Sequence, residues 1–357
     1  MEKITANHFI TDDKTDKVYM SSLIDKSTGD LDADVRSQLK NCIRHFARKS
    51  ELLYNTKDVW ARDYMPIQLT KDVYLSYTYK PDYLQDIPEC ITNWQLHKVR
   101  TQRQYTNDEH FDFKVVHIPL ILDGGNVIKA TVNNKPCIIM CDKVLQENNI
   151  NYEDFQNWWK NWWEENFDGT EMELVLLPWE GSKDNPIGHA DGMVRYISDG
   201  QILMTNYLDY DEKFKDNHGS RIQLELEKAG FTVNRLHFMD KFEYETDKMF
   251  RLLFNKTWCY INFLQIGNSI LLPSLGYEEL DREAIRQVKE AFSNTGQKIK
   301  VELINIDMTN IVEDMNEGQN SGGALNCLTW TVKSAQGGLS VADGCRCLTK
   351  ELDMIAC

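Results

Sequence analysis

The sequence predicts an α/β protein, on the basis of three observations. Short runs rich in Val, Ile and Tyr recur along the 357 residues, bounded by turn residues, as is typical of strands. Segments with apolar residues at spacings of three and four separate these runs, which is typical of amphipathic helices. A hydrophobic content of 42%, with 11% aromatic residues, is enough to bury a large core.

The expected strands and helices alternate, and no low-complexity linker marks a domain boundary. The helical segments carry Asp or Ser near their starts and Gly near their ends, which favours these boundaries. We expect strands at 8–13, 73–79, 113–122, 136–141, 173–179, 193–197, 201–208, 258–266, 269–275 and 301–306. We expect helices at 32–51, 152–167, 219–230 and 281–296.

The charge of the chain limits its partners. A formal net charge of −15 and a pI near 5.0 argue against a nucleic acid or an anionic membrane, because either needs a basic surface. The N-terminus lacks a basic stretch followed by an apolar one, and no segment offers the ~18 apolar residues of a membrane span. We therefore expect a soluble, cytoplasmic protein and, from its acidity, weakly favour a cationic ligand.

The nine cysteines do not have the dense, regular spacing of a disulfide scaffold, which fits a reducing compartment. Cys345 and Cys347 lack a second Cys or His pair at zinc-finger spacing, and Cys137 and Cys141 lie in an apolar run. We expect no metal and no cofactor.

Five segments combine an extended run with a polar or turn element, and their polar residues are evenly spread. Asp63, Asp123, His189, Asn262 and Cys327 are separated by 60, 66, 73 and 65 residues. Such spacing suggests five related supersecondary units, each delivering one polar group to a common place. The alternative is a chance selection of residues.

The segment GHADG places His189 and Asp191 two residues apart. In an extended segment both side chains point to the same face and can share one ligand, and the flanking glycines favour close approach of that ligand. The alternative is a surface histidine beside a solubilising aspartate.

The segment WARDYMP places Trp60, Arg62 and Asp63 just before a proline, in an extended or turn conformation. A tryptophan face beside a carboxylate suits a flat cation, because the ring attracts positive charge and the carboxylate accepts N–H donors. A local Arg62–Asp63 salt bridge with Trp60 in the core explains the motif equally well.

In LDGGN, Asp123 ends an apolar strand, and two glycines permit a turn, which a type I′ hairpin explains by itself. Cys327, in GGALNCLTW, is a candidate nucleophile, because a thiolate attacks carbon readily and a histidine elsewhere in the fold can handle protons. Alone, a cysteine in an apolar strand is usually inert core. Its glycine-flanked context, shared with the other segments, favours a functional role.

Together the ordered motifs W-x-R-D-x-x-P, D-G-G-N, G-H-x-D and G-G-x-x-x-C resemble the agmatine deiminase and bacterial-type (Porphyromonas-type) peptidylarginine deiminase family, a guanidine-modifying branch of the pentein superfamily. The resemblance runs from about residue 8 to residue 335 and leaves 336–357 as a tail. It implies one catalytic domain over 1–357, folded as a five-bladed, pseudo-fivefold α/β propeller of ββαβ units.

The resemblance also implies roles. Cys327 is similar to the nucleophile that forms a covalent amidino-thioether, and His189 to its acid and base. Asp63 and Asp191 resemble the carboxylates that bind the guanidinium, with Trp60 stacking nearby and Asp123 holding His189. Asn262 resembles an asparagine that lines the substrate site.

Two residues depart from the agmatine deiminase pattern. Asp123 stands where Glu is usual, and Asn326 where a His usually precedes the nucleophile. The segment GHADGMVRY also lacks the longer acidic, Asn-bearing stretch of true agmatine deiminases. These departures bear on the substrate more than on the reaction.

The resemblance favours deimination of agmatine to N-carbamoylputrescine, a step of putrescine biosynthesis. The alternatives are free or peptidyl arginine as substrate, transfer of the amidino group to an amine, and a pentein-fold binding protein without catalysis. The expected partner is a small guanidino compound or an arginyl peptide, with no nucleic acid and no membrane.

Three further segments have uncertain roles. Trp158, Trp159, Trp162 and Trp163 make a broad aromatic helix face, which we expect to pack on its own blade; a homo-oligomer contact and a lid are the alternatives. The acidic stretch 312–323 suits either a mobile loop over a cation site or a plain solvated loop. The tail at 336–357 receives no role.

Overall fold

The computed structural model describes residues 1–25, 33–54, 56, 58–81, 114–179, 188–313 and 323–334. Their strands form five sheets of three strands each, and every sheet combines one antiparallel with one parallel pair. In strand order the sheets are β15-β1-β2, β3-β4-β5, β6-β7-β8, β11-β10-β9 and β12-β13-β14.

The strands are short, as suits blades that meet near one axis. The first three sheets contain β1 (Lys17–Ser21), β2 (Ser50–Leu53), β15 (Thr329–Val332), β3 (Ile67–Gln68), β4 (Val73–Thr78), β5 (Lys114–Ile121), β6 (Ile128–Val132), β7 (Lys135–Cys141) and β8 (Glu173–Leu177). The other two contain β9 (Val194–Ser198), β10 (Gln201–Met204), β11 (Thr232–Arg235), β12 (Leu264–Ile266), β13 (Ser269–Leu272) and β14 (Lys300–Leu303).

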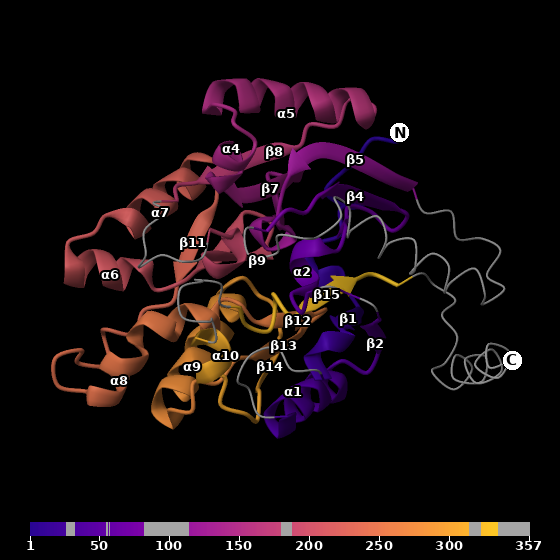
Figure 1. Cartoon of the computed structure of the whole chain (residues 1–357). Helices are drawn as coiled ribbons and strands as arrows, with labels where there is room; N and C mark the ends of the chain where they lie inside the picture. Colours follow the sequence, from indigo (N-terminus) through magenta and orange to yellow (C-terminus); the bar gives the residue numbers. More distant parts are fainter. Residues whose placement is uncertain are drawn as a thin grey trace, which may run out of the picture.

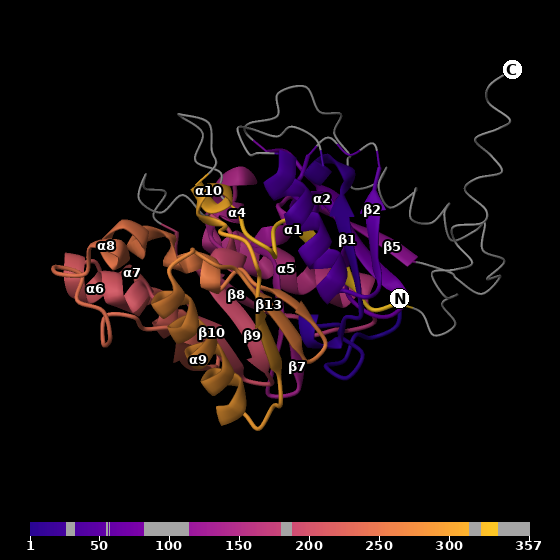
Figure 2. The same ribbon diagram turned by 90° about the horizontal axis from the view of Figure 1, so that it is seen from below.

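Helices connect the parallel strands and lie on the outside of the molecule, with the sheets toward its centre (Figures 1 and 2). These connecting helices are α1 (Ala33–Phe46), α4 (Lys143–Glu147), α5 (Tyr152–Asn166), α6 (Tyr207–Phe214), α7 (His218–Lys228) and α9 (Glu278–Asn294). The remaining helices are α2 (Ala61–Tyr64), α8 (Lys248–Leu253), α10 (Thr309–Glu313), η1 (Asp12–Lys14), η2 (Ser22–Asp25), η3 (Gly124–Asn126), η4 (Ala190–Gly192) and η5 (Phe254–Tyr260).

The repeated ββαβ pattern confirms the predicted pentein fold and the five related units. In the sheets β6-β7-β8, β11-β10-β9 and β12-β13-β14, two adjacent antiparallel strands are followed by a helical crossover and a parallel third strand, because only a connection long enough to return can place strands parallel. In β3-β4-β5 most of the connection between the parallel strands, 82–113, lies outside the described residues. The first sheet differs, since its antiparallel pair joins the two ends of the described chain: β15 pairs with β1, with Val18 opposite Thr331.

Buried side chains hold each helix to its sheet. On α5, Phe155, Trp159, Trp162 and Trp163 are buried in one core cluster, which confirms that the tryptophan-rich face packs on its own blade. Asn151 caps this helix by accepting from the Asp154 N–H. Among the described residues, no helix is both long and apolar enough to cross a membrane.

The structure corrects several local predictions. Residues 8–13 form no strand but a turn leading into η1, and 258–260 belong to η5, so that only Leu264–Ile266 of the segment 258–266 is a strand. Strands β1, β2, β6 and β11 and helices α4, α6 and α8 were not predicted, because they are short or lack clear periodicity. The tail at 336–357 and most of the acidic stretch, 314–322, lie outside the described residues.

Candidate active site

Each of the five predicted polar residues lies in the turn directly before the first strand of a blade. Asp63 belongs to α2, before β3, and Asp123 precedes η3 and β6. His189 precedes η4 and β9, Asn262 lies between η5 and β12, and Cys327 lies in the turn before β15. Equivalent turns of a fivefold arrangement meet at one end of the axis, and this explains the near-equal spacing.

Gly125 shows how closely these turns approach one another. A Cβ atom added at Gly125 would lie 2.5 Å from Asp63 Oδ1, 2.9 Å from His189 Nδ1 and 3.3 Å from Asp191 Oδ2. At Gly124 it would lie 2.1 Å from the Arg62 carbonyl oxygen. Neither glycine has a positive φ, and the turn is a 3₁₀ helix, so close packing and not a type I′ turn requires them.

His189 lies between two carboxylates. Its Nε2 is 2.9 Å from Asp123 Oδ2, and its Nδ1 is 3.6 Å from Asp63 Oδ1. Burial lowers the pKa of His189, but the charges of Asp63 and Asp123 outweigh it and raise that pKa to about 9. The imidazole is therefore protonated at neutral pH.

The expected extended geometry of GHADG holds only in part. His189 is extended, with φ −123° and ψ 135°, whereas Asp191 lies in the 3₁₀ helix η4. Both side chains nevertheless reach the same place, because the tight turn bends the chain around Gly125.

Asp123 contacts two cationic groups through one oxygen. Its Oδ2 accepts from His189 and also from Lys143 Nζ, at 3.3 Å. Burial raises the pKa of Asp123, but His189 and Lys143 together lower it to about 2. Lys143 also pairs with Glu147 Oε1, at 2.9 Å. In spite of its shorter side chain, Asp123 thus reaches His189.

Asp63 is fixed by the backbone. Its Oδ1 accepts the Gly125 N–H at 2.9 Å, and Tyr77 donates its hydroxyl to the Asp63 carbonyl at 2.7 Å. Burial raises the pKa of Asp63 to about 7; His189 opposes this rise, and the nearby Asp123 and Asp191 add to it. The alternative of an Arg62–Asp63 salt bridge is wrong, because the Arg62 guanidinium binds Asn326 instead.

Cys327 is buried against Asp191 and Asn262. Its Sγ lies 3.3 Å from Asp191 Oδ2 and 3.2 Å from Asn262 Nδ2. Burial, together with the negative charges of Asp191 and Asp63, raises the pKa of the Cys327 thiol well above its ordinary value. Without a ligand the group is thus a neutral thiol that donates to a carboxylate.

Asn262 organises the turn that carries the thiol. Its Oδ1 accepts the backbone N–H groups of Asn326 and Cys327, at 3.1 and 3.3 Å, and its Nδ2 also donates to the Asp191 carbonyl, at 3.2 Å. Its amide therefore binds protein groups on both sides. Its predicted contact with substrate stays a prediction.

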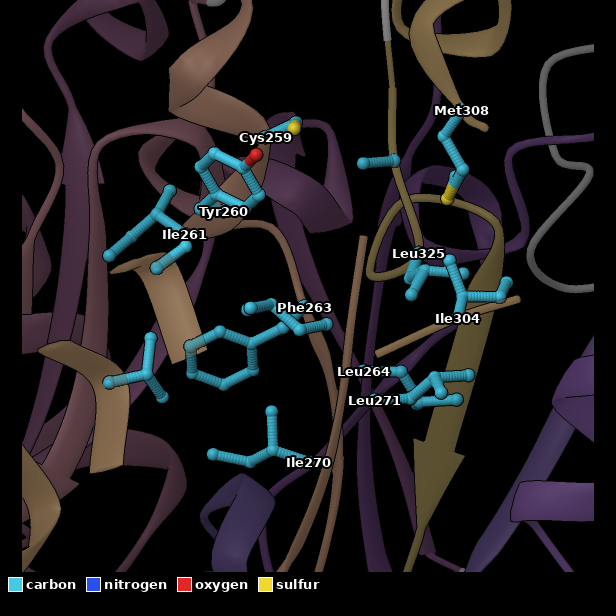
Figure 3. Close-up of a cluster of buried hydrophobic side chains, with 14 of the residues drawn as sticks. Cys259, Tyr260, Ile261, Phe263, Leu264, Ile270, Leu271, Ile304, Met308 and Leu325 are labelled. Atoms are coloured by element: carbon cyan, nitrogen blue, oxygen red, sulfur yellow. The ribbon is translucent and has the colours of Figure 1, made fainter. Parts of the chain in front are cut away.

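The turn before β15 is also held by apolar packing. Leu325, two residues before Cys327, lies beside Ile304 and Met308 in the core cluster that contains β12 and β13 (Figure 3). Because Leu325 is fully buried there, Cys327 is attached to a rigid part of the fold.

Trp60 is half-buried at the start of α2 and lies against Gly323. A Cβ at Gly323 would come within 2.2 Å of the indole ring. The indole therefore packs on the glycine-rich approach to Cys327. Its stacking on a substrate stays a prediction.

Sequence reasoning missed three residues that shape the site. Lys143 holds Asp123, and Tyr77 holds the α2 turn. Asn126 accepts the backbone N–H groups of Cys141 and Ala190, at 2.7 and 3.2 Å, and so joins two blades. Only Asn126 had a sequence signal, as the last residue of the D-G-G-N motif.

Among the described residues, one group has the composition of a metal site, and it lies outside the active site. It consists of Asp209 and Glu212 on α6 and His237 after β11. In this group His237 Nδ1 contacts Asp209 Oδ1, and His237 Nε2 lies 2.9 Å from Asp240 Oδ1. The buried thiol of Cys141 donates to the Gly188 carbonyl at 2.6 Å.

The fold and this cluster of residues define the class of the protein. It is a five-bladed pentein with a thiol, an imidazole and three carboxylates at one end of its axis. The chain belongs to the Porphyromonas-type peptidyl-arginine deiminase family, whose profile matches residues 14–332.

One relative in sequence and several solved structures are similar to this chain. A Legionella pneumophila protein named "Putative agmatine deiminase" is 23% identical over an alignment of 238 residues, which covers 63% of this chain and 58% of that protein. An Enterococcus faecalis agmatine deiminase superimposes with a TM-score of 0.62 at 15% identity, over 94% of this chain and all of its own. For a C. jejuni agmatine deiminase the TM-score is 0.58 at 15% identity, over 91% of this chain and 95% of its own.

Proposed function

We propose that this protein hydrolyses a guanidino group to a ureido group and ammonia, with agmatine as substrate and N-carbamoylputrescine as product. The observation that carries the proposal is Asp191 Oδ1. This oxygen is fully buried and accepts no hydrogen bond within the described part of the chain. A buried, unpaired carboxylate oxygen is costly, and a guanidinium N–H donor is a partner that removes the cost.

Binding of the substrate changes the state of the thiol. Asp191 and Asp63 accept hydrogen bonds from the guanidinium nitrogens. The positive charge of the guanidinium offsets the two carboxylates that hold the pKa of Cys327 high. The thiol can then release its proton to solvent, and Asn262 Nδ2 donates to the resulting thiolate. The thiol thus ionises more readily when a guanidinium is bound beside it.

Attack of Sγ on the guanidinium carbon forms a C–S bond and a tetrahedral adduct. His189, protonated at neutral pH, donates its proton to the departing nitrogen, so the C–N bond breaks and ammonia leaves. The remaining amidino group is bound to Cys327 as a thioether.

Water completes the reaction. The neutral His189 accepts a proton from water, the hydroxyl adds to the same carbon, and the C–S bond breaks. The departing thiolate takes up the proton of the hydroxyl group, which leaves a neutral ureido product and restores the thiol. One water is consumed, and one ureido group and one ammonia are formed. The charge of Asp123 keeps the imidazole oriented through both proton transfers.

The choice of agmatine is supported by the relatives named agmatine deiminases, whereas the family description supports peptidyl arginine. A colorimetric ureido assay over agmatine, free arginine and arginyl peptides, with ammonia measured in parallel, tests both. We expect ureido product and ammonia in equal amounts from agmatine, and none from Cys327→Ala.

Unchanged ureido production by Cys327→Ala would rule out the mechanism. Activity confined to peptides would replace agmatine by arginyl peptides as substrate. A new guanidino compound in place of the ureido product would indicate transfer of the amidino group to an amine. A folded protein that is inactive on every substrate would be a binding protein.

A further inference from the structure

Asn326, the residue before Cys327, forms side-chain hydrogen bonds in two opposite directions. Its Nδ2 donates to Asp191 Oδ2 at 2.7 Å, and its Oδ1 accepts from Arg62 Nη2 at 3.0 Å. A guanidinium only donates and a carboxylate only accepts, so the orientation of the amide between them is fixed. Asn326 is buried, and no rotation of this amide keeps both bonds.

These bonds divide the two oxygens of Asp191. Oδ2 accepts from Asn326 and from the thiol of Cys327. Oδ1 is buried and accepts from no described residue. Because Asn326 holds Oδ2, the carboxylate cannot turn to offer both oxygens to a ligand.

Arg62 is tied to the same turn from several directions. Its Nη2 also donates to Thr331 Oγ1 at 3.2 Å, its Nε to the Asn326 carbonyl at 3.4 Å, and its backbone N–H to the Cys327 carbonyl at 3.1 Å. Arg62 is also the neighbour of Asp63 in α2. One short helix therefore supplies one carboxylate of the clamp and restrains the other.

The intervening amide also keeps two guanidinium groups apart. If Arg62 paired directly with Asp191, its own fork would occupy the carboxylate in the way that a guanidino substrate would. Asn326 instead satisfies Arg62 on one side and presents a neutral donor to Asp191 on the other. The negative charge of Asp191 remains available to a ligand.

We propose that Asn326 and Arg62 are positioning residues, which hold Asp191 so that it binds the guanidino group through Oδ1 alone. This inference rests on the proposed function and assigns a task to the residue that departs from the agmatine deiminase pattern.

The test uses methylguanidinium, which carries only the group that the clamp binds, so recognition of the rest of a substrate does not enter. Iodoacetamide alkylates Cys327 of the free protein slowly, through its small fraction of thiolate, and mass spectrometry follows that residue. A bound methylguanidinium covers Sγ and excludes iodoacetamide, so the concentration of methylguanidinium that halves the rate measures its binding. Because the readout follows one residue of the folded protein, a loss of stability alone leaves the half-protecting concentration unchanged.

We expect Asn326→Ala to raise the half-protecting concentration about 10- to 100-fold, as loss of a residue that orients a ligating group typically does. With agmatine as substrate, KM rises by a larger factor than kcat falls. Arg62→Met keeps the apolar stem of the side chain and is expected to raise the half-protecting concentration about 10-fold. It replaces Asn326→Ala as the test if that variant does not fold. Thr331→Val is the matched control. It removes one acceptor of Arg62 but leaves the hydrogen bond from Arg62 to the Asn326 side chain, and its half-protecting concentration should stay within about twofold of the wild type.

The inference is overturned if Asn326→Ala and Arg62→Met are protected at the wild-type concentration and keep the wild-type KM while the wild type deiminates normally. The proposed function then stands. If methylguanidinium does not protect the wild type, and the wild type also makes no ureido product, the proposed function fails and the inference falls with it.

Discussion

The two halves of the active site are held in different ways. Around His189 the partners are charged, with Asp123, Lys143 and Glu147 in a chain that reaches the partly exposed surface. Around Cys327 the direct partners are the neutral amide of Asn262 and the carboxylate of Asp191. The amide of Asn326 in turn donates to that carboxylate. All four side chains are buried.

The difference follows from what each half has to do. In the proposed mechanism His189 has to carry its proton at the working pH, and the carboxylates beside it keep it protonated by raising its pKa to about 9. A nucleophile whose substrate is itself a cation needs no permanent positive partner, because such a partner would compete with the substrate for the same carboxylates. Neutral amides fix the geometry and leave the charge to the substrate.

Loss of His189, from the half of the site with charged partners, has the largest expected effect. His189→Gln removes the proton carrier but not the carboxylate clamp, so kcat falls about 10³- to 10⁴-fold while methylguanidinium still protects Cys327 from alkylation. Steady-state kinetics and the protection assay measure the two effects. His237→Gln, a substitution of a remote histidine, is the control and should leave kcat unchanged; loss of protection in His189→Gln would show that the two halves are not separable.

Disturbing the contact between the halves comes next. Gly125→Ala places a Cβ within 2.5 to 3.3 Å of Asp63, His189 and Asp191, so these groups must move apart, and kcat/KM falls about 100-fold, the cost of a displacement of about 1 Å. Gly219→Ala in α7 meets backbone atoms as closely, at 2.7 Å, but far from the site. It should lower the melting temperature without lowering kcat/KM per folded molecule; wild-type kinetics in Gly125→Ala would contradict this account.

Breaking the neutral half costs stability as well as activity. Asn262→Ala leaves the buried N–H of Cys327 without its acceptor, whereas the N–H of Asn326 keeps the Asn262 carbonyl, and it is expected to lower the free energy of unfolding by about 2 kcal/mol. It also removes the donor to Sγ, so alkylation of Cys327 slows about tenfold at neutral pH. Urea unfolding and alkylation rates measure these effects.

A buried asparagine elsewhere separates the two consequences. Asn206→Ala removes the Nδ2 bond to Thr257 Oγ1, at 2.7 Å, and should lower stability by a similar amount while alkylation of Cys327 stays at the wild-type rate. Equal alkylation rates in both variants would show that Asn262 has only a structural role.

The smallest expected effect is a shift of the pH profile of kcat/KM, which tests the charged partners of His189. In the wild type, kcat/KM falls as the pH rises through about 9, because His189 loses the proton that it donates to the leaving group. The positive charge of Lys143 lowers the pKa of His189, so Lys143→Met raises this pKa and moves the fall to higher pH. At pH 7 His189 is protonated in both proteins, and kcat changes less than about twofold.

Lys143→Arg keeps the charge and should keep the wild-type profile. A shift of the Lys143→Met profile to lower pH would mean that Lys143 acts on another group.

The fold and the site were predictable to different depths. The even spacing of Asp63, Asp123, His189, Asn262 and Cys327 was visible because a repeated unit imposes a period on the chain. Strand β3, with two residues, carries no readable period. The extended assignment of 8–13 is wrong because η1 is set by a short turn: Thr15 donates back to the Asp12 carbonyl.

The contacts between the turns could not be read from the sequence. The bond from Arg62 to Asn326 joins residues 264 apart, and the contact of Lys143 with Asp123 depends on how α4 leaves β7. Such contacts follow from the relative rotation of blades, which no local pattern encodes. The motifs therefore predicted which groups meet, but not how each is held.

The pairing of β15 with β1 has a consequence for synthesis of the protein. Cys327 directly precedes β15, the last strand of the five sheets, so the ribosome adds the thiol after the residues of the other four turns. A nascent or truncated chain that ends before Thr329 lacks the antiparallel partner of β1 and leaves one edge of that strand open. Closure of the ring of sheets and placement of the proposed nucleophile thus depend on the same strand.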